Sequence, residues 1–172
     1  MRENMGIYRG KRLEKSVWDK SEWVVGSFID SGNHSQVAIF PPVNGASTMR
    51  VSDLVRLRMV GVDPDTVGRC VGIPDNIGKM MFEDDIIKMN GNDKDLAVIK
   101  FGEFACVSID PAEKVDKVIG WYYTPLETDA LSQVEPFCWD FQINEMWVKE
   151  TDIRVIGNIH DNPELLERSA EE

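Results

Sequence analysis

The feature that most constrains the fold is Asn90-Gly91, which stands between two apolar runs at residues 85–89 and 96–101. Residues 90–93 (NGND) are expected to form the hairpin turn, because Asn followed by Gly readily adopts the positive φ that such turns favour. The sequence therefore predicts an antiparallel hairpin with strands over 85–89 and 96–101.

Short β-rich runs separated by turn residues recur along the rest of the chain. Runs of β-branched and aromatic residues bounded by Gly, Asn, Asp or Pro are typical of strands. Residues 50–60 fit both strand and helix spacing, and their Val content favours a strand. No strand alternates with a long helical pattern, which excludes a doubly wound parallel sheet. The further predicted strands are 5–9, 23–29, 36–40, 67–71, 118–124, 136–141 and 153–159.

Helix signals are few and short. Asp110-Pro111 predicts a brief helix before strand 118–124, and residues 126–134 are expected to form a helical turn. The segment 161–168, with Asx, Pro and Glu at its start, predicts a short C-terminal helix. In the loop over 72–79, Gly78 is the expected left-handed residue. We predict a mainly β (β-rich α+β) fold with short antiparallel strands, a small SH3-like barrel over about 67–160 and a short C-terminal helix.

Charge is distributed unevenly along the 172 residues. Residues 1–60 carry a net charge of +3 and residues 61–172 a net charge of −14, which together give −11. We predict an N-terminal β subdomain over 1–60 and a barrel-like subdomain with the C-terminal helix over 61–172, which can pack as one domain. The acidic net charge disfavours nucleic-acid binding. The basic start can still contact nucleic acid, or it forms a solvated face; its residues are Arg2, Arg9, Lys11, Arg12 and Lys15.

Cysteine usage and hydropathy indicate a cytoplasmic protein. The three cysteines, Cys70, Cys106 and Cys138, are odd in number and widely spaced. We expect free thiols in a reducing compartment rather than a disulfide framework or a zinc site. No run approaches the roughly 18 apolar residues of a membrane span, and the start lacks the apolar stretch of a secretory signal.

No motif for catalysis stands out. The two histidines are His34, in a predicted turn, and His160, at the end of a predicted strand. The chain contains no H-E-x-x-H, no Cys/His cluster and no phosphate-binding glycine loop. We therefore predict no catalytic residue, no cofactor and no metal. An alternative is a metal-dependent enzyme with oxygen ligands; its candidate residues are Asp63, Asp65, Glu83 and Asp85.

Aromatic residues offer the strongest candidate for a binding surface. Five tryptophans are many for this length, and Trp121-Tyr122-Tyr123 places aromatic rings on both faces of a predicted strand. Burial in the core or in a subunit interface is one interpretation, and contact with a partner is the other. The candidate interaction surface comprises Trp121, Tyr122, Tyr123, Trp139 and Trp147.

Five short phrases occur in a characteristic order. They are RGKR at 9–12, EWVVG at 22–26, VDPDTVG at 62–68, GKMMFEDDII at 78–87 and VIGNIHDNPEL at 155–165. Together they resemble the YopX family of phage and prophage proteins over nearly the whole chain. The chain departs from the family pattern at Asp84, where the family usually has glycine, at Cys70 or Val71, where it often has an aromatic residue, and at His160, where it has Tyr or Phe.

The resemblance implies a mostly β protein with a small barrel, encoded by phages and mobile elements, and it carries over no catalytic residue. Our leading hypothesis is a phage- or prophage-encoded accessory protein in the bacterial host cell, which binds another protein without catalysis. Self-association is a further expectation, because surplus aromatic surface favours it. The alternative is a nucleic-acid-associated β-barrel protein.

Overall fold

The computed structural model describes residues 6–14, 21–32, 36–42, 50, 52, 58–109, 112–126 and 133–167. The chain divides into two compact units, Met1–Cys70 (unit 1) and Val71–Glu172 (unit 2). Most of the predicted strand over 50–60 and of the predicted helical turn over 126–134 lies outside the described residues, as does His34. No helix within the described ranges is long and apolar enough to cross a membrane.

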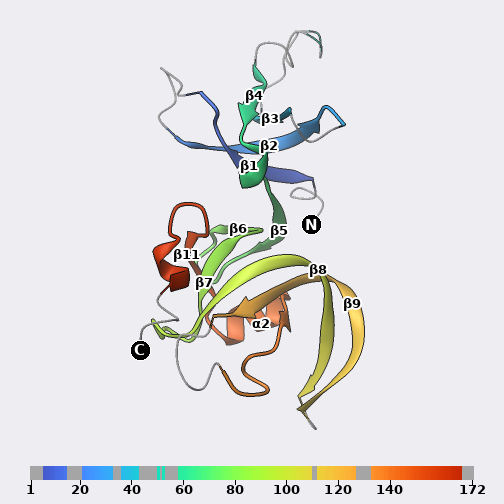
Figure 1. Cartoon of the computed structure of the whole chain (residues 1–172), viewed down its shortest axis with the longest axis vertical. Helices are drawn as coiled ribbons and strands as arrows, with labels where there is room; N and C mark the ends of the chain where they lie inside the picture. The colour runs from blue at the N-terminus through green and yellow to red at the C-terminus, as the bar shows by residue number, and fades with distance from the viewer. Residues whose placement is uncertain are drawn as a thin grey trace. The chain divides into compact units, whose positions relative to one another are not determined.

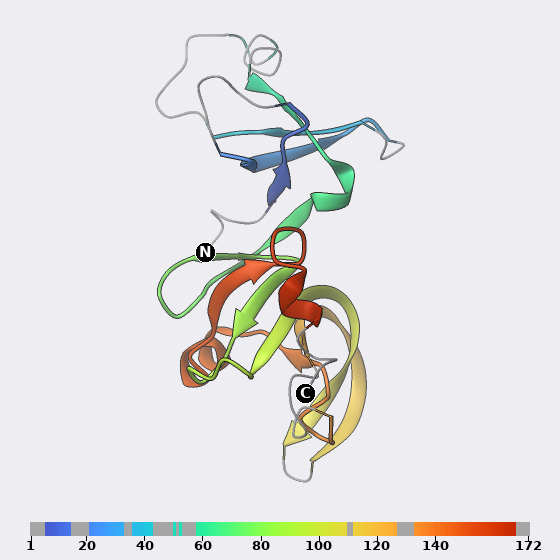
Figure 2. The same ribbon diagram turned by 60° about the vertical axis from the view of Figure 1, so that its left-hand side comes forward.

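Unit 1 is an antiparallel β structure that closes on itself (Figure 1; Figure 2, blue to green). Sheet order is β4-β3-β2-β1-β5. The end of β1 returns to β4, because Arg12 bridges Val62 and the Asp63 amide donates to the Lys11 carbonyl at 2.8 Å. A small barrel results. The elements are β1 (Ile7–Lys11), β2 (Trp23–Asp30), β3 (Val37–Phe40), β4 (Val60–Val62), the 3₁₀ turn η1 (Pro64–Thr66) and the start of β5 (Gly68–Pro74).

Two glycines allow the strands of unit 1 to approach closely. A Cβ at Gly10 would lie 3.0 Å from the Val62 side chain, and one at Gly26 would clash with the Phe40 carbonyl oxygen. Both glycines belong to phrases that the sequence analysis singled out. The predicted strands over 23–29 and 36–40 are confirmed as β2 and β3, which pair with each other as an antiparallel hairpin. The core of the unit is formed by Val24, Val37, Ile39 and Val62.

Unit 2 is built on a curled antiparallel sheet with the order β10-β9-β8-β7-β11, and Figure 1 shows its long β8–β9 hairpin bending round as a half-barrel. β5 continues into this unit and pairs there with β6. The elements are β6 (Met80–Phe82), β7 (Asp85–Lys88), β8 (Leu96–Ile109), β9 (Ala112–Pro125), β10 (Phe141–Gln142), α2 (Glu145–Glu150), β11 (Arg154–Asn158) and α3 (Glu164–Glu167).

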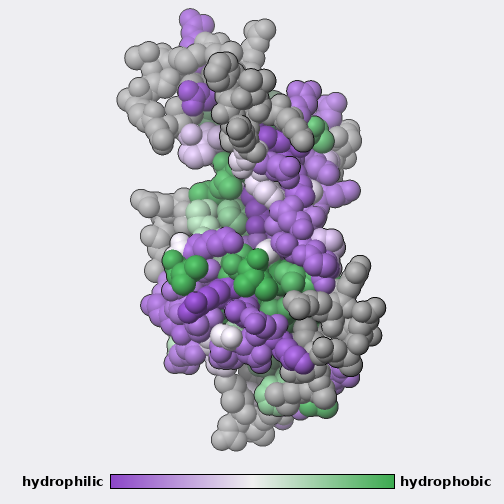
Figure 3. All heavy atoms as spheres, turned by 90° about the vertical axis from the view of Figure 1, so that its left-hand side faces the viewer, coloured by the Kyte–Doolittle hydropathy of each residue, from purple (hydrophilic) through white to green (hydrophobic). Residues whose placement is uncertain are grey.

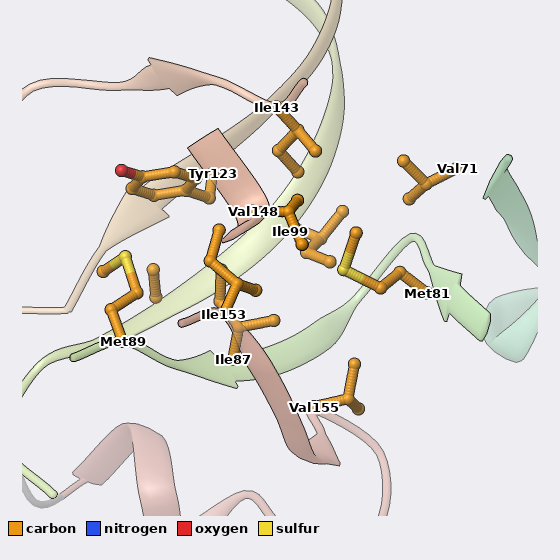
Figure 4. Close-up of a cluster of buried hydrophobic side chains, with 11 residues drawn as sticks. Val71, Met81, Ile87, Met89, Ile99, Tyr123, Ile143, Val148, Ile153 and Val155 are labelled. Atoms are coloured by element: carbon orange, nitrogen blue, oxygen red, sulfur yellow. The ribbon is translucent and has the colours of Figure 1, made fainter. Parts of the chain in front are cut away.

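The core of unit 2 lies between the sheet and α2. Figure 4 shows Ile87, Ile99 and Ile153 at its centre, and none of the three is exposed. Met side chains fill the irregular space beside them. The buried cluster comprises Val71, Met81, Ile87, Met89, Ala97, Ile99, Tyr123, Ile143, Val148, Ile153 and Val155.

The mainly β fold and the short C-terminal helix are confirmed. The hairpin around Asn90-Gly91 is also confirmed, and these two residues have φ of 54° and 67°. They lie within a longer connection, because the strand pairing ends at Lys88↔Leu96 and the Met89 amide donates to the Asp95 carbonyl. The predicted helix after Asp110 is wrong, because β9 begins at Ala112. The predicted strand over 136–141 is wrong except at its end, because residues 133–139 form turns. Helix α2 was not predicted.

Candidate functional site

Two of the five candidate aromatic residues are buried in unit 2. Tyr123 is 3% exposed and Trp139 is 7% exposed. The Tyr123 hydroxyl accepts a hydrogen bond from Trp147 Nε1 at 2.7 Å, which joins α2 to the sheet. Burial raises the pKa of Tyr123 to about 12, because the phenolate would lose its hydration. Tyr123 and Trp147 therefore hold α2 on the sheet.

The other aromatic residues of β9 lie on opposite faces of the strand, as the alternation predicts. Trp121 pairs in register with Phe101, and their ring centroids are 5.0 Å apart in an edge-to-face arrangement. Tyr122 stacks on Phe104 at 4.9 Å on the other face. Phe104 is buried, so Tyr122 covers an apolar side chain on its face. Trp121 lies on the opposite face, next to the exposed part of the hairpin.

Beyond Trp121, the apolar face of the hairpin continues into solvent. Phe101 is 37% exposed and Ile119 is 76% exposed. Register and alternation place both on the face that carries Trp121, and we call Phe101, Ile119 and Trp121 the hairpin face. Phe101 and Ile119 both lie in predicted strands, over 96–101 and 118–124, but the sequence analysis did not pair these strands and so did not recognise this face.

The exposed part of this hairpin is a two-stranded ribbon. Within the described residues, β7 pairs with β8 only at residues 96–98, and β10 pairs with β9 only at residues 122–123. The Glu103 carboxylate and the Lys117 ammonium form an exposed ion pair of 2.7 Å beside Ile119. Exposed apolar side chains also occur elsewhere in unit 2, for example Ile77 and Ile156, and Figure 3 shows hydrophobic groups gathered on one side of it.

Two of the phrases in the sequence meet at a polar junction in unit 2. The Asp84 carbonyl accepts from the Ile159 amide at 3.1 Å, and Asp84 Oδ2 lies 3.8 Å from His160 Nε2. Asp85 pairs in register with Asn158. Its carboxylate is buried and accepts from the Phe82 amide at 2.8 Å. These contacts fasten the β6–β7 turn to the turn that follows β11.

Asn158 organises the second of these turns. Its Oδ1 accepts from the amides of His160 and Asp161, each at 3.0 Å, and its Nδ2 donates to Asp161 Oδ2 at 2.9 Å. A Cβ at Gly157 would clash with the Asn162 side chain, so a larger residue there would require that side chain to move. The phrase over 155–165 therefore has a structural role: it closes the sheet and leads into α3.

The loop before β6 is fastened to the outer edge of β11 by a buried carboxylate. Asp75 Oδ1 accepts from the amides of Ile77 and Lys79 at 3.0 and 2.8 Å, and Oδ2 accepts from the Val155 amide at 3.1 Å. Gly78 has a φ of +88°, which confirms the predicted left-handed position. The arrangement covers a sheet edge that would otherwise offer unpaired amides.

The four candidate metal ligands are divided between the two units. Asp63 and Asp65 belong to unit 1, where Asp63 Oδ1 accepts from the Asp65 amide at 3.1 Å and caps η1. Glu83 and Asp85 belong to unit 2, and Asp85 is directed at the Phe82 amide. Across the ranges that the structure describes, no group of three or more His, Cys, Asp or Glu side chains is placed to hold a metal ion. That the protein has no catalytic centre stays a prediction.

The comparison with known proteins supports three of the five ordered phrases, because the matched residues exclude RGKR at 9–12 and EWVVG at 22–26. No curated protein matches the chain. The family model described as YopX protein matches residues 43–167, which include the polar junction, the Asp75 loop and the β8–β9 hairpin. This match covers well over half of the chain, so the chain belongs to the YopX family and is a phage-type protein.

Proposed function

We propose that this YopX-family protein is a phage- or prophage-encoded accessory protein that acts without catalysis, as a protein-interaction module in the cytoplasm of the bacterial host. The observation that carries the proposal is the hairpin face, an apolar surface that extends from the core of unit 2 to side chains exposed to solvent. Ile119 is 76% exposed on an ordered strand, beside Phe101 and Trp121. Apolar groups exposed together in this way mark interaction sites more often than isolated ones do.

The chemistry around this face suits a protein partner. Its centre is aliphatic and aromatic, and the Glu103–Lys117 ion pair provides a polar margin. Protein interfaces commonly combine an aromatic-rich centre with a polar rim. Full burial of one isoleucine side chain contributes about 1.5–3 kcal/mol. A ribbon without a third strand is also only marginally stable by itself, so a partner packed against it would add support.

The test is capture from a host lysate by tagged protein, run with and without nuclease. Wild type is compared with Ile119→Asp and with the matched control Ile77→Asp, because Ile77 is 67% exposed in a different part of unit 2. We expect wild type and Ile77→Asp to retain the same protein, and Ile119→Asp to lose it. Circular dichroism should show that all three proteins are folded.

Two outcomes would contradict the proposal. One is equal capture by wild type and Ile119→Asp, which would show that the hairpin face makes no contact. The other is capture that disappears on nuclease treatment. Light scattering on the purified proteins identifies a further case: a wild-type dimer that becomes monomeric in Ile119→Asp would make a second copy of the chain the partner.

A further inference from the structure

We further propose that the outer face of β1 and β2 binds single-stranded nucleic acid, as a site separate from the hairpin face. The pairs Arg9↔Val25 and Lys11↔Trp23 place these four side chains on one side of the two strands. Their neighbours Gly10 and Val24 lie on the other side, toward the core of the barrel. We call Arg9, Lys11, Trp23 and Val25 the basic face.

Two cations of the basic face lie over its one aromatic ring. The Arg9 guanidinium carbon lies 4.8 Å from the centroid of the Trp23 ring, and Lys11 Nζ lies 5.5 Å from it. Proteins that bind single strands combine a ring on which a base stacks with cations that follow the phosphates. Stacking requires an unpaired base, so this arrangement favours a single strand over a duplex.

Charge complementarity supports a polyanionic ligand for unit 1. Residues 1–70 hold ten Lys/Arg and eight Asp/Glu, a net charge of +2, whereas residues 71–172 hold nine and twenty-two, a net charge of −13. Electrostatic interactions in solution decay over about 10 Å at 0.1 M salt. The basic face therefore acts on a phosphate mainly through its own cations, and the whole-chain charge of −11 does not exclude contact.

Binding should be weak and should depend on salt in a defined way. Glu22 is exposed next to Trp23, and its negative charge makes the electrostatic potential there less favourable for a phosphate. We therefore expect a Kd of about 10⁻⁵ M for the single strand, as for non-specific binding. Two phosphate contacts on a single strand predict a slope of about −1.4 for log K against log salt. The affinity should then fall about sevenfold between 50 and 200 mM salt.

The experiment is fluorescence anisotropy with labelled dT20 and the full-length protein. Lys11→Gln should weaken binding and reduce the salt slope by about 0.7. Trp23→Ala should weaken binding about fivefold or more, because it removes the stacking ring. Lys149→Gln is the matched control, since Lys149 is exposed on α2 and its loss changes the net charge equally. Thermal melts check that each variant is folded, and Lys11→Gln tests the site even where Trp23→Ala does not fold.

Three results would overturn this proposal. Wild type could show no binding at 50 mM salt. Lys11→Gln and Lys149→Gln could weaken binding equally, which would make the effect one of net charge. Poly-glutamate could compete as well as unlabelled dT20 while Trp23→Ala binds normally, which would identify an acidic polymer site without base stacking. Ile119→Asp should bind dT20 like wild type, so failure here is independent of the protein-interaction proposal.

Discussion

At the scale of single residues, Asp84 has an unusual backbone conformation with a clear structural cause. Its φ is 65°, in the left-handed region that favours glycine. Its amide donates to the Ile99 carbonyl at 2.9 Å, and its carbonyl accepts from Ile159. Because both backbone groups are bonded, the conformation is fixed by its neighbours and does not depend on the aspartate side chain.

This conformation makes Asp84 a position where glycine should be tolerated and a branched residue should not. We expect Asp84→Gly to change the free energy of unfolding by less than about 1 kcal/mol. Glycine removes the backbone strain at positive φ, and this gain offsets both the greater entropy of the unfolded chain and the loss of the side-chain contact with His160. Asp84→Val should lower it by about 1–3 kcal/mol. Urea unfolding measures both. A larger loss for glycine than for valine would contradict this account of the turn.

Tyr123 predicts how stability should depend on alkaline pH. An unfolded tyrosine ionises near pH 10, whereas burial raises the pKa of Tyr123 to about 12. Between these values the unfolded chain binds fewer protons than the folded protein, so stability falls as the pH rises. At pH 11 the loss from this residue is about 1.4 kcal/mol. It is absent below pH 9, where both states are protonated.

Tyr123→Phe isolates this effect from the other groups that titrate at high pH. At pH 8 the variant should be less stable than wild type by about 1 kcal/mol, because the hydrogen bond from Trp147 is lost. At pH 11 the difference should disappear or reverse. Urea unfolding at the two pH values provides the measurement, and the same difference at both would show that Tyr123 ionises normally in the folded protein.

At the scale of elements, the local signals worked where one turn or strand had no competing interpretation. Asn90-Gly91 fixed a hairpin, and the runs over 85–89 and 96–101 supplied its strands. Asp110-Pro111 failed because the same two residue types start helices and also join strands. Only the pairing of β8 with β9, which extends from Ala97↔Pro125 to Ile109↔Ala112, decides between them. Because the pairing of 96–101 with 118–124 was not predicted, the candidate surface did not include Phe101 and Ile119, although both lie in predicted strands.

Helix α2 was missed although a signal was available. Asn144 Oδ1 accepts from the Trp147 amide at 2.9 Å, which is the usual role of an N-cap asparagine. The helix has only six residues, and its buried side is represented by Val148. Such a short helix depends on packing against a sheet, here through Trp147 and Tyr123, and that packing is not visible in the local sequence.

The junction between the Asp75 loop and β11 gives a prediction at this scale. Asp75→Ala removes the acceptor of three amide hydrogen bonds in a buried site, so we expect a loss of about 3 kcal/mol in the free energy of unfolding. The control is Asp93→Ala, because the Asp93 side chain is 88% exposed in its ion pair with Lys88. That change should cost less than about 1 kcal/mol. Urea unfolding compares the two, and similar losses would show that the loop does not depend on Asp75.

At the scale of the whole molecule, the sequence already separated a basic start from an acidic remainder. The net charge of −11 conceals what that separation means for binding. The structure places two cations over the Trp23 ring in unit 1 and places the hairpin face in unit 2. The cation contacts of Trp23 are not readable from the sequence, because they depend on the register of β1 against β2.

Because the two proposed surfaces belong to different units, their effects should be independent. Residues that share no contacts have nearly additive effects, whereas residues in one network do not. We expect Lys11→Gln to capture the protein partner like wild type, and Ile119→Asp to bind dT20 like wild type. The double variant should lose both activities by the amounts that the single variants lose. Anisotropy and lysate capture on all four proteins test this. Loss of partner capture in Lys11→Gln would mean that one ligand spans both surfaces, and the two proposals would then describe a single site.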